Sequence, residues 1–427
     1  MNRIILLGNG FDLAHGLKTS YQDFIIYYWE NLFWELEKCP YDKFKNELCS
    51  IELIHNEMTQ IAGLTWKEFL ENYKFKEKEG REKQFLSIIK NTKSTRIKRT
   101  PFFEEIEKEL SQKRWVDIEN KYYEVLKRIF RGKEYTPQTL NKELEYLTNQ
   151  LIAYLKDIQD KRTINEHIKK IIYEPFRAKD IALEGQDKFK QFISSRWERG
   201  LKESHFEKQR FVEYYGQKYD KNATQKYIHA VRLSSSEGLP ESDNHYFNVV
   251  SCPDRIADLV YFLLPENVLL LNFNYTNTAE LYADTENINY IHGKLDSPAS
   301  IIFGYGDEID KDYDSISELN DNEYLKNIKS IRYSESDNYR KLLEFISSAP
   351  FQLCIMGHSC GTSDRTLLNT LFEHENCISI KPYFYRNNKG NDNYRELIQN
   401  ISRCFTNKRQ MRDRVVNKTF CEPFSLE

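Results

Sequence analysis

The hydrophobic pattern of the chain changes character a little past its middle. After an apolar run at residues 4–7, apolar residues recur every three or four positions to about residue 232, which predicts a series of amphipathic helices. Residues 234–240 then break the pattern with Ser, Gly and Pro. Beyond this break, short apolar runs alternate with helical segments, which is typical of a parallel sheet with helices on its faces.

Several helices of the first half have recognisable starts. Ser20 precedes one apolar helix, and Thr100-Pro101 and Thr136-Pro137 place a capping residue before a proline. The segment after Thr136 carries a leucine stripe of nearly heptad spacing, which we expect to pack against another helix or another chain. Helices are predicted at residues 21–37, 43–61, 66–78, from 100 onward, at 115–129 and at 136–158.

The apolar run at residues 4–7 has no strand-like run near it in the sequence to pair with. We therefore expect that run to join the later strands in one sheet. Strands are predicted at 4–7, 268–273, 288–291, 301–303, 351–356 and 378–384, with helices at 254–264, 339–347 and 366–372. The predicted fold class is α/β, a Rossmann-like parallel sheet with a large, mostly α-helical insertion. Residues 1–27 and 245–427 would form the α/β domain, and residues 28–244 the insertion.

Composition narrows the class of protein. With 427 residues, 40% hydrophobic and 30% charged, the chain can build a large core. A net charge of −3 gives no general attraction to nucleic acid or to anionic membranes. No Cys-x-x-Cys pair supports a zinc ribbon or a redox motif. The start is unlike a signal peptide, and no apolar run reaches the roughly 20 residues of a membrane span, so we expect a cytoplasmic protein.

Polar turns follow five of the predicted strands. Because the carboxyl ends of parallel strands meet at one edge of a sheet, these turns are expected to converge on one crevice. Each turn alone is equally consistent with ordinary turn chemistry, but five at one edge favour a ligand site. The turns are Gly8–Asp12, Asn272–Thr276, His292-Gly293, Gly304–Asp307 and Gly357–Asp364.

Three parts of the sequence resemble a known family. Residues 7–24, Leu-Gly-Asn-Gly-Phe-Asp-Leu-Ala-His-Gly-Leu-Lys-Thr-Ser-Tyr-Gln-Asp-Phe, resemble the signature of the AbiH family of bacterial phage abortive-infection proteins. Residues 115–119 resemble a second element of that family, and Asn272–Thr276 with His292-Gly293 a third. The set as a whole is similar to the sirtuin-like fold.

The resemblance implies an anti-phage effector with a sirtuin-like domain that hydrolyses the nicotinamide–ribose bond of NAD⁺. NAD⁺ would be the substrate, and no further cofactor is implied. Asn274 and His292 fall on the catalytic Asn and His of such domains. The nucleotide-binding residues implied or expected around them are Gly8, Asn9, Gly10, Phe11, Asp12, His15, Tyr275, Gly357, His358, Ser359 and Asp364. Among these, Gly8 and Gly10 correspond to the turn that holds the diphosphate, and Gly357, Ser359 and Asp364 to the turn that meets the adenosine half.

Elementary chemistry agrees with these roles. Cleavage builds oxocarbenium character on the ribose, an Asn amide can hold a water or a ribose hydroxyl, and a His can take the proton. Backbone N–H groups near Gly8 and Gly10 would suit a diphosphate. Three positions depart from the sirtuin pattern: Asn9 replaces a small residue, Asp12 a Ser, and Thr276 an Asp. A nucleotide other than NAD⁺ therefore stays open as the substrate.

Other interpretations of the same residues stay open. His292 can be a structural histidine under a turn, and Asn274 a turn residue. Asp117 and Glu119 are two apart on a predicted helix and so face different ways, and one of them is a candidate to reach the crevice. A second hypothesis is a nucleotide-binding sensor without turnover. A third is a metal-dependent phosphoesterase or nuclease using Asp12, His15, His292 and His358, although their spacing matches no metal motif and no metal is expected.

The expected partners follow from the same hypothesis. They are the nucleotide substrate, further copies of the chain in a homo-oligomer, and a phage-derived trigger protein. A membrane or a nucleic-acid partner is not expected, because the basic stretches at 81–99 and 408–414 suit solvated surfaces.

Overall fold

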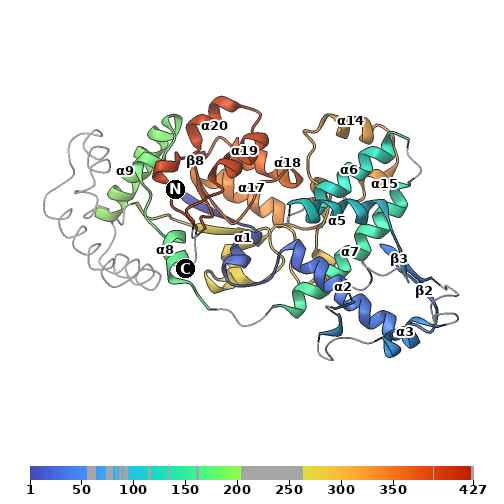
Figure 1. Cartoon of the computed structure of the whole chain (residues 1–427). Coiled ribbons are helices and arrows are strands. Elements are labelled where there is room, and N and C mark those ends of the chain that lie inside the picture. Colours follow the sequence, from blue (N-terminus) through green and yellow to red (C-terminus); the bar gives the residue numbers. More distant parts are fainter. Residues whose placement is uncertain are drawn as a thin grey trace. The chain divides into compact units, whose positions relative to one another are not determined.

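A computed structural model describes most of the chain, in two compact units (Figure 1). One unit comprises Met1–Gly16, Lys161–Ile301 and Tyr333–Glu427, and the other Leu17–Asp160 and Ile302–Arg332. The described residues are 1–54, 64–73, 80–82, 84–85, 89, 95–113, 117–132, 135–159, 163–202, 263–387 and 389–424. The predicted break at 234–240 and nearly all of the predicted helix at 254–264 lie outside them.

The first unit is built on a parallel sheet of five strands. Its order is β6-β5-β1-β7-β8. The strands are β1 (Asn2–Leu7), β5 (Val268–Asn272), β6 (Ile288–Tyr290), β7 (Phe351–Met356) and β8 (Cys377–Tyr383). The α/β fold is thus confirmed, and the first strand lies between β5 and β7, as the pattern predicted. Strand order reverses between β1 and β7, which is where ligands bind in sheets of this kind.

The composition of β1 explains its central place. All six of its residues are buried, as expected for a strand covered on both faces, and four are Ile or Leu. Alternate residues point to opposite faces. Ile5 and Leu7 therefore share one core cluster with Ile168 and Ile172 of α8, which covers that face of the sheet.

The helices of the first unit follow the predicted pattern in most places. The predicted helices at 339–347 and 366–372 are α17 and α18 within one residue at each end. The predicted strand at 301–303 is wrong, because these residues join no sheet. The helices are α1 (Asn9–Ala14), α8 (Glu166–Ile172), α9 (Gln186–Lys202), α17 (Asn338–Ser348), α18 (Arg365–Phe372), α19 (Tyr394–Cys404) and α20 (Lys408–Arg414). Short 3₁₀ turns are η1 (Ala178–Asp180), η2 (Leu183–Gly185), η4 (Thr278–Leu281), η5 (Thr285–Asn287), η6 (Pro298–Ser300), η7 (Tyr333–Glu335), η8 (Thr362–Asp364) and η9 (Lys418–Phe420).

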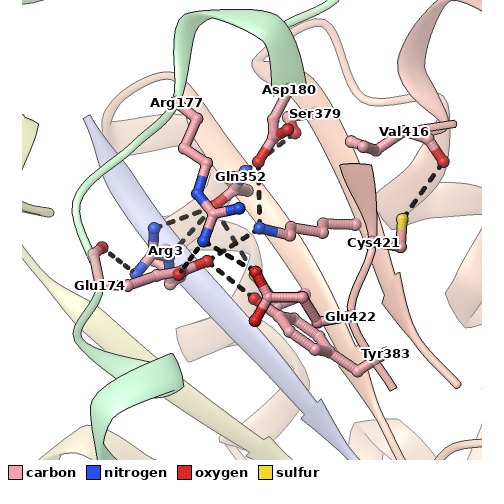
Figure 2. Close-up of polar contacts among 12 residues, drawn as sticks. Arg3, Glu174, Arg177, Asp180, Gln352, Ser379, Tyr383, Val416, Cys421 and Glu422 are labelled. Carbon is pink, nitrogen blue, oxygen red and sulfur yellow. Dashed lines mark hydrogen bonds and ion pairs between the residues drawn. The ribbon is translucent and has the colours of Figure 1, made fainter. Parts of the chain in front are cut away.

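A buried ionic cluster lies on the α8 face of the same sheet. Figure 2 shows the side chains of Glu174, Arg177 and Asp180, which come from the segment after α8, in one cluster with Arg3 of β1 and Gln352 of β7. The ammonium of Lys381 lies 2.9 Å from Glu174 Oε1 and 3.1 Å from Asp180 Oδ2. Arg3 donates to Gln352 Oε1 at 3.0 Å and to the Glu174 carbonyl at 2.5 Å. The cluster ties the segment after α8 to strands β1, β7 and β8.

The second unit combines helices with a small antiparallel sheet. The helix predicted at 43–61 is wrong, because β2 (Lys43–Lys45) and β3 (Cys49–Leu53) pair there, with β4 (Thr95–Arg99) beyond β3. Alternate residues of β3 are buried, which is the period of a strand. The helices are α2 (Tyr21–Glu37), α3 (Trp66–Asn72), α5 (Pro101–Lys113), α6 (Ile118–Phe130), α7 (Pro137–Asp157), α14 (Lys311–Ser317), α15 (Asn322–Leu325) and α16 (Lys329–Arg332).

The helix starts predicted for this unit agree with their caps. Ser20 accepts a hydrogen bond from the Asp23 amide at the start of α2, and Thr136 one from Thr139 at the start of α7. The leucine stripe of α7, Leu140 to Leu155, is buried, and α7 packs on α2, α6 and α15. The stripe therefore packs against helices of the same chain.

The proposed domain boundaries at residues 27 and 245 stay a prediction. The compact units agree with a discontinuous sheet-bearing part that contains both ends of the chain. They also assign α8 and α9, which the sequence pattern grouped with the insertion, to the unit that holds the sheet.

Candidate functional site

The glycine turns after β1 and β7 pack directly against each other. A Cβ atom on Gly8 would lie 2.5 Å from the Cα of His358, and one on Gly10 would lie 2.8 Å from the Cα of Gly357. Gly357 has φ +73°, a conformation that favours glycine, and any Cβ there would clash with the Phe11 amide. These three glycines let two backbones meet where the strand order reverses.

This packing occupies N–H groups that were expected to bind a diphosphate. The Gly8 and Gly10 amides donate to the carbonyls of Met356 and Gly357 at 3.2 and 2.8 Å, and the Phe11 amide donates to Gly8 at 2.8 Å. The turn also begins α1 at Asn9, which the sequence pattern missed. A diphosphate at this edge would need other donors.

Two departures from the sirtuin pattern are hydrogen-bonded to each other. The Thr276 hydroxyl donates to Asp12 Oδ2 at 2.6 Å, and each residue is only 1% exposed. A carboxylate at position 12 and a hydroxyl at position 276 thus form an acceptor–donor pair between the turns after β1 and β5.

Asn274 lies in the turn after β5, half-buried, and faces the first glycine. Its Nδ2 donates to the Gly8 carbonyl at 3.0 Å, while its own amide donates to Asn272 Oδ1 at 3.0 Å. The side-chain amide has a second N–H and an oxygen with which it can bind a ligand. Tyr275 beside it is half-buried too.

His292 and His358 come from the turns after β6 and β7 and meet at one carboxylate. Asp364 Oδ1 lies 3.4 Å from Nε2 of His292, and Oδ2 lies 3.6 Å from Nε2 of His358. The Phe273 ring contacts both imidazoles, with centroids 5.2 and 4.2 Å apart. The structure therefore brings together the predicted residues His292, His358 and Asp364. Ser359 directly follows His358 and is exposed, and its backbone carbonyl accepts a hydrogen bond from Asn400 Nδ2 at 2.9 Å.

Tyr333 is a site residue that sequence reasoning missed. Its hydroxyl lies 3.1 Å from His292 Nε2, and its ring stacks parallel to that of His292. It belongs to η7, which is not one of the turns that follow a strand. No sequence motif includes it, so the sequence gives no signal for its role.

His15 is held by partners in the first unit. The Asn165 amide donates to the Tyr282 hydroxyl at 2.8 Å, and this hydroxyl lies 2.6 Å from His15 Nε2. The other ring nitrogen lies 2.7 Å from the Phe11 carbonyl, so the simplest assignment is a neutral ring protonated on Nδ1.

Asp117 and Glu119 have partners in the second unit. Asp117 caps α6 by accepting from the Asn120 amide at 2.9 Å. Glu119 accepts from the Gly304 amide at 3.1 Å and from the buried ammonium of Lys329 at 2.8 Å. The Glu119 contacts link α6 to Gly304 and α16, whereas the Asp117 contact caps α6 itself. Both carboxylates thus have a structural role.

In the part of the chain that the structure describes, no group of three or more His, Cys, Asp or Glu side chains is arranged to hold a metal ion. Nor is any helix of that part both long enough and apolar enough to cross a membrane.

Comparison with known proteins identifies the family. The model of the family described as "Bacteriophage abortive infection AbiH" matches residues 4–214 and 201–385, which together span most of the chain. Searches of curated proteins and of solved structures return no match. The matched ranges include most of β1, the glycine turn and the turns that carry Asn274, His292 and Asp364. The chain belongs to the AbiH family of bacteriophage abortive infection proteins.

Proposed function

We propose that this AbiH protein is an abortive-infection effector that hydrolyses NAD⁺, or a closely related nucleotide, through a sirtuin-like domain. One observation carries the proposal. Turns from β1, β5, β6 and β7 bring an amide, two imidazoles and a carboxylate to the carboxyl edge of a parallel sheet, beside the point where strand order reverses. Phe273, the chain neighbour of Asn274, contacts both imidazoles.

In the proposed reaction, water attacks C1′ of the ribose and the C–N bond to nicotinamide breaks. Nicotinamide leaves with the bonding electron pair as a neutral molecule, and His292 takes the proton of the attacking water. Asn274 orients that water or a ribose hydroxyl. The glycosidic bond is already activated by the positive charge of the nicotinamide ring, so the protein needs to supply positioning and a base.

The test is release of nicotinamide from NAD⁺ by the purified full chain. Release should fall at least about a hundredfold in His292→Ala and Asn274→Ala, within the range of general-base catalysis. His374→Ala is the matched control, since His374 lies outside the site and its ring nitrogen Nδ1 accepts a local hydrogen bond from the Asn376 backbone amide. It should release nicotinamide like the wild type.

Activation has to be part of this experiment, because an effector that kills its host must rest inactive. The proposal includes a phage-derived trigger and a homo-oligomer, so the assay is repeated with lysate of phage-infected cells and across protein concentrations. No release under any of these conditions, or undiminished release by His292→Ala, would contradict the proposal. Tight NAD⁺ binding by calorimetry without nicotinamide release would instead favour a nucleotide-binding sensor.

A further inference from the structure

We infer that Asp364 is a positioning residue that keeps the ring protons of His292 and His358 on Nε2. This inference rests on the proposed role of His292 as general base. It assigns Asp364 to the histidines, where the family resemblance implied a contact with the adenosine half of the nucleotide.

The placement of Asp364 supports this assignment. It ends η8 and precedes α18, yet its side chain makes no capping hydrogen bond to that helix. The carboxylate is 8% exposed, and each of its oxygens lies near Nε2 of a different histidine, at 3.4 and 3.6 Å. One carboxylate therefore faces two imidazoles that come from separate turns.

For His358 the second ring nitrogen decides the tautomer. Nδ1 of His358 lies 3.0 Å from the Cys360 amide nitrogen, and a backbone N–H can only donate. Nδ1 must therefore accept, and the proton of the neutral ring is on Nε2, the atom that faces Asp364.

For His292 two assignments compete. Nε2 lies near Asp364 and also 3.1 Å from the Tyr333 hydroxyl. If Tyr333 donated to Nε2, a nitrogen lone pair would face a buried carboxylate, which is unfavourable. A proton on Nε2 is attracted by the carboxylate and leaves the Tyr333 oxygen as a second acceptor. We therefore assign the proton of His292 to Nε2.

This tautomer determines which nitrogen does chemistry. With Nε2 protonated, Nδ1 of His292 is the basic nitrogen. In the proposed reaction an O–H bond of the attacking water breaks and an N–H bond forms at Nδ1. The imidazolium so formed is stabilised by the Asp364 carboxylate, which does not itself take up the proton.

The experiment is ¹⁵N NMR of histidine-labelled full-length protein. Single His→Gln variants assign His292 and His358 among the nine histidines. Both rings should show a protonated Nε2 and an unprotonated Nδ1. In Asp364→Asn, His292 should become a mixture of tautomers, and kcat should fall about ten- to a hundredfold with little change in KM.

Two controls separate positioning from stability. Asp180→Asn alters another buried carboxylate of the same unit, which pairs with Lys381, and should leave the spectra of both histidines unchanged. Tyr333→Phe removes the competing hydroxyl and should leave the His292 proton on Nε2 even if Asp364→Asn does not fold.

A proton on Nδ1 of His292 in the wild type would overturn the inference, as would identical histidine spectra in Asp364→Asn. The spectra do not depend on turnover. If NAD⁺ is not cleaved but the spectra are as expected, the proposed function fails while the assignment of Asp364 stands.

Discussion

At the scale of single residues, the site depends on contacts between turns that are far apart in the sequence. Asp12 and Thr276 each depart from the sirtuin pattern, and an acid at position 12 would by itself repel a phosphate. Because the two side chains hydrogen-bond to each other, the departure at one position is matched by the departure at the other. Glycine is required at positions 8, 10 and 357 because no side chain fits between the two turns.

Glu143 is a buried residue whose ionisation should set a pH dependence. It lies on α7 and is 1% exposed, and burial raises its pKa to about 7. The folded state holds this proton up to about pH 7, whereas the unfolded chain releases it near the ordinary glutamate value of about 4.3. Stability from this group is present below the unfolded pKa and is lost as pH rises through the folded pKa.

We expect Glu143→Gln to remove this loss. Denaturant unfolding should show similar stability of wild type and variant at pH 4.5, and a variant more stable by about 3 kcal/mol at pH 8. Glu145→Gln, on the exposed side of the same helix, should change neither value appreciably. Equal pH profiles for wild type and Glu143→Gln would show that Glu143 does not titrate as expected.

At the scale of elements, buried strands of the parallel sheet were the most predictable features. The run at 351–356 coincides with β7, because a strand covered on both faces needs continuous apolar residues. The helix predicted at 43–61 is wrong because β2 and β3 lie there, in a small sheet that is only partly buried and therefore lacks a continuous apolar run. Such strands carry a weak pattern that resembles a polar helix over a few residues.

The buried ionic cluster beside β1 leads to a prediction about the stability that β8 contributes through Lys381. Lys381 of β8 is fully buried between Glu174 and Asp180. Burial opposes ionisation of Glu174, but Lys381, Arg3 and Arg177 outweigh burial and lower its pKa. Lys381→Met keeps the length of the side chain and removes its charge, so it should lower the free energy of unfolding by about 3–5 kcal/mol at pH 7.

The measurement is chemical unfolding followed by tryptophan fluorescence or circular dichroism. Lys389→Met, at an exposed position of the same unit, is the control and should differ from wild type by less than about 0.5 kcal/mol. In the wild type, the contribution of ionised Glu174 should disappear as pH falls through its lowered pKa, so the two curves should converge in acid. A cost for Lys381→Met no larger than for Lys389→Met would contradict this account.

At the scale of the whole molecule, both ends of the chain meet in the first unit. β1 pairs with β5 and β7, and Phe424, near the end of the sequence, stacks on Phe11 of the glycine turn with ring centroids 6.3 Å apart. The Phe424 amide also donates to the Phe384 carbonyl at 2.6 Å. The turn at the candidate site is thus packed against Phe424, which is more than four hundred positions away from Phe11 in sequence.

Phe424→Ala should therefore destabilise the sheet-bearing unit. Loss of a buried aromatic side chain costs about 3 kcal/mol, and thermal unfolding of the full chain should begin at lower temperature. Phe420→Ala changes a half-buried phenylalanine nearby and should cost less than half as much. Equal effects of the two changes would mean that the contact with Phe11 contributes little.

The sequence by itself determined the local features. Periodicity, caps and continuous apolar runs specified most helices and the five strands of the main sheet, and the opening motif indicated the family. These features depend on neighbours within a few residues, which is why they can be recognised in the chain.

Only the tertiary structure decided which side chains meet. Asp364 lies near two histidines, Tyr333 lies beside His292, and Thr276 donates to Asp12. The two residues of each contact are between 6 and 264 positions apart, and sheet register and strand order bring them together. Glu119 pairs with Lys329, a contact within the second unit that no local pattern indicated. No local pattern encodes such pairs, because register and topology are properties of the packed sheet and not of any one strand.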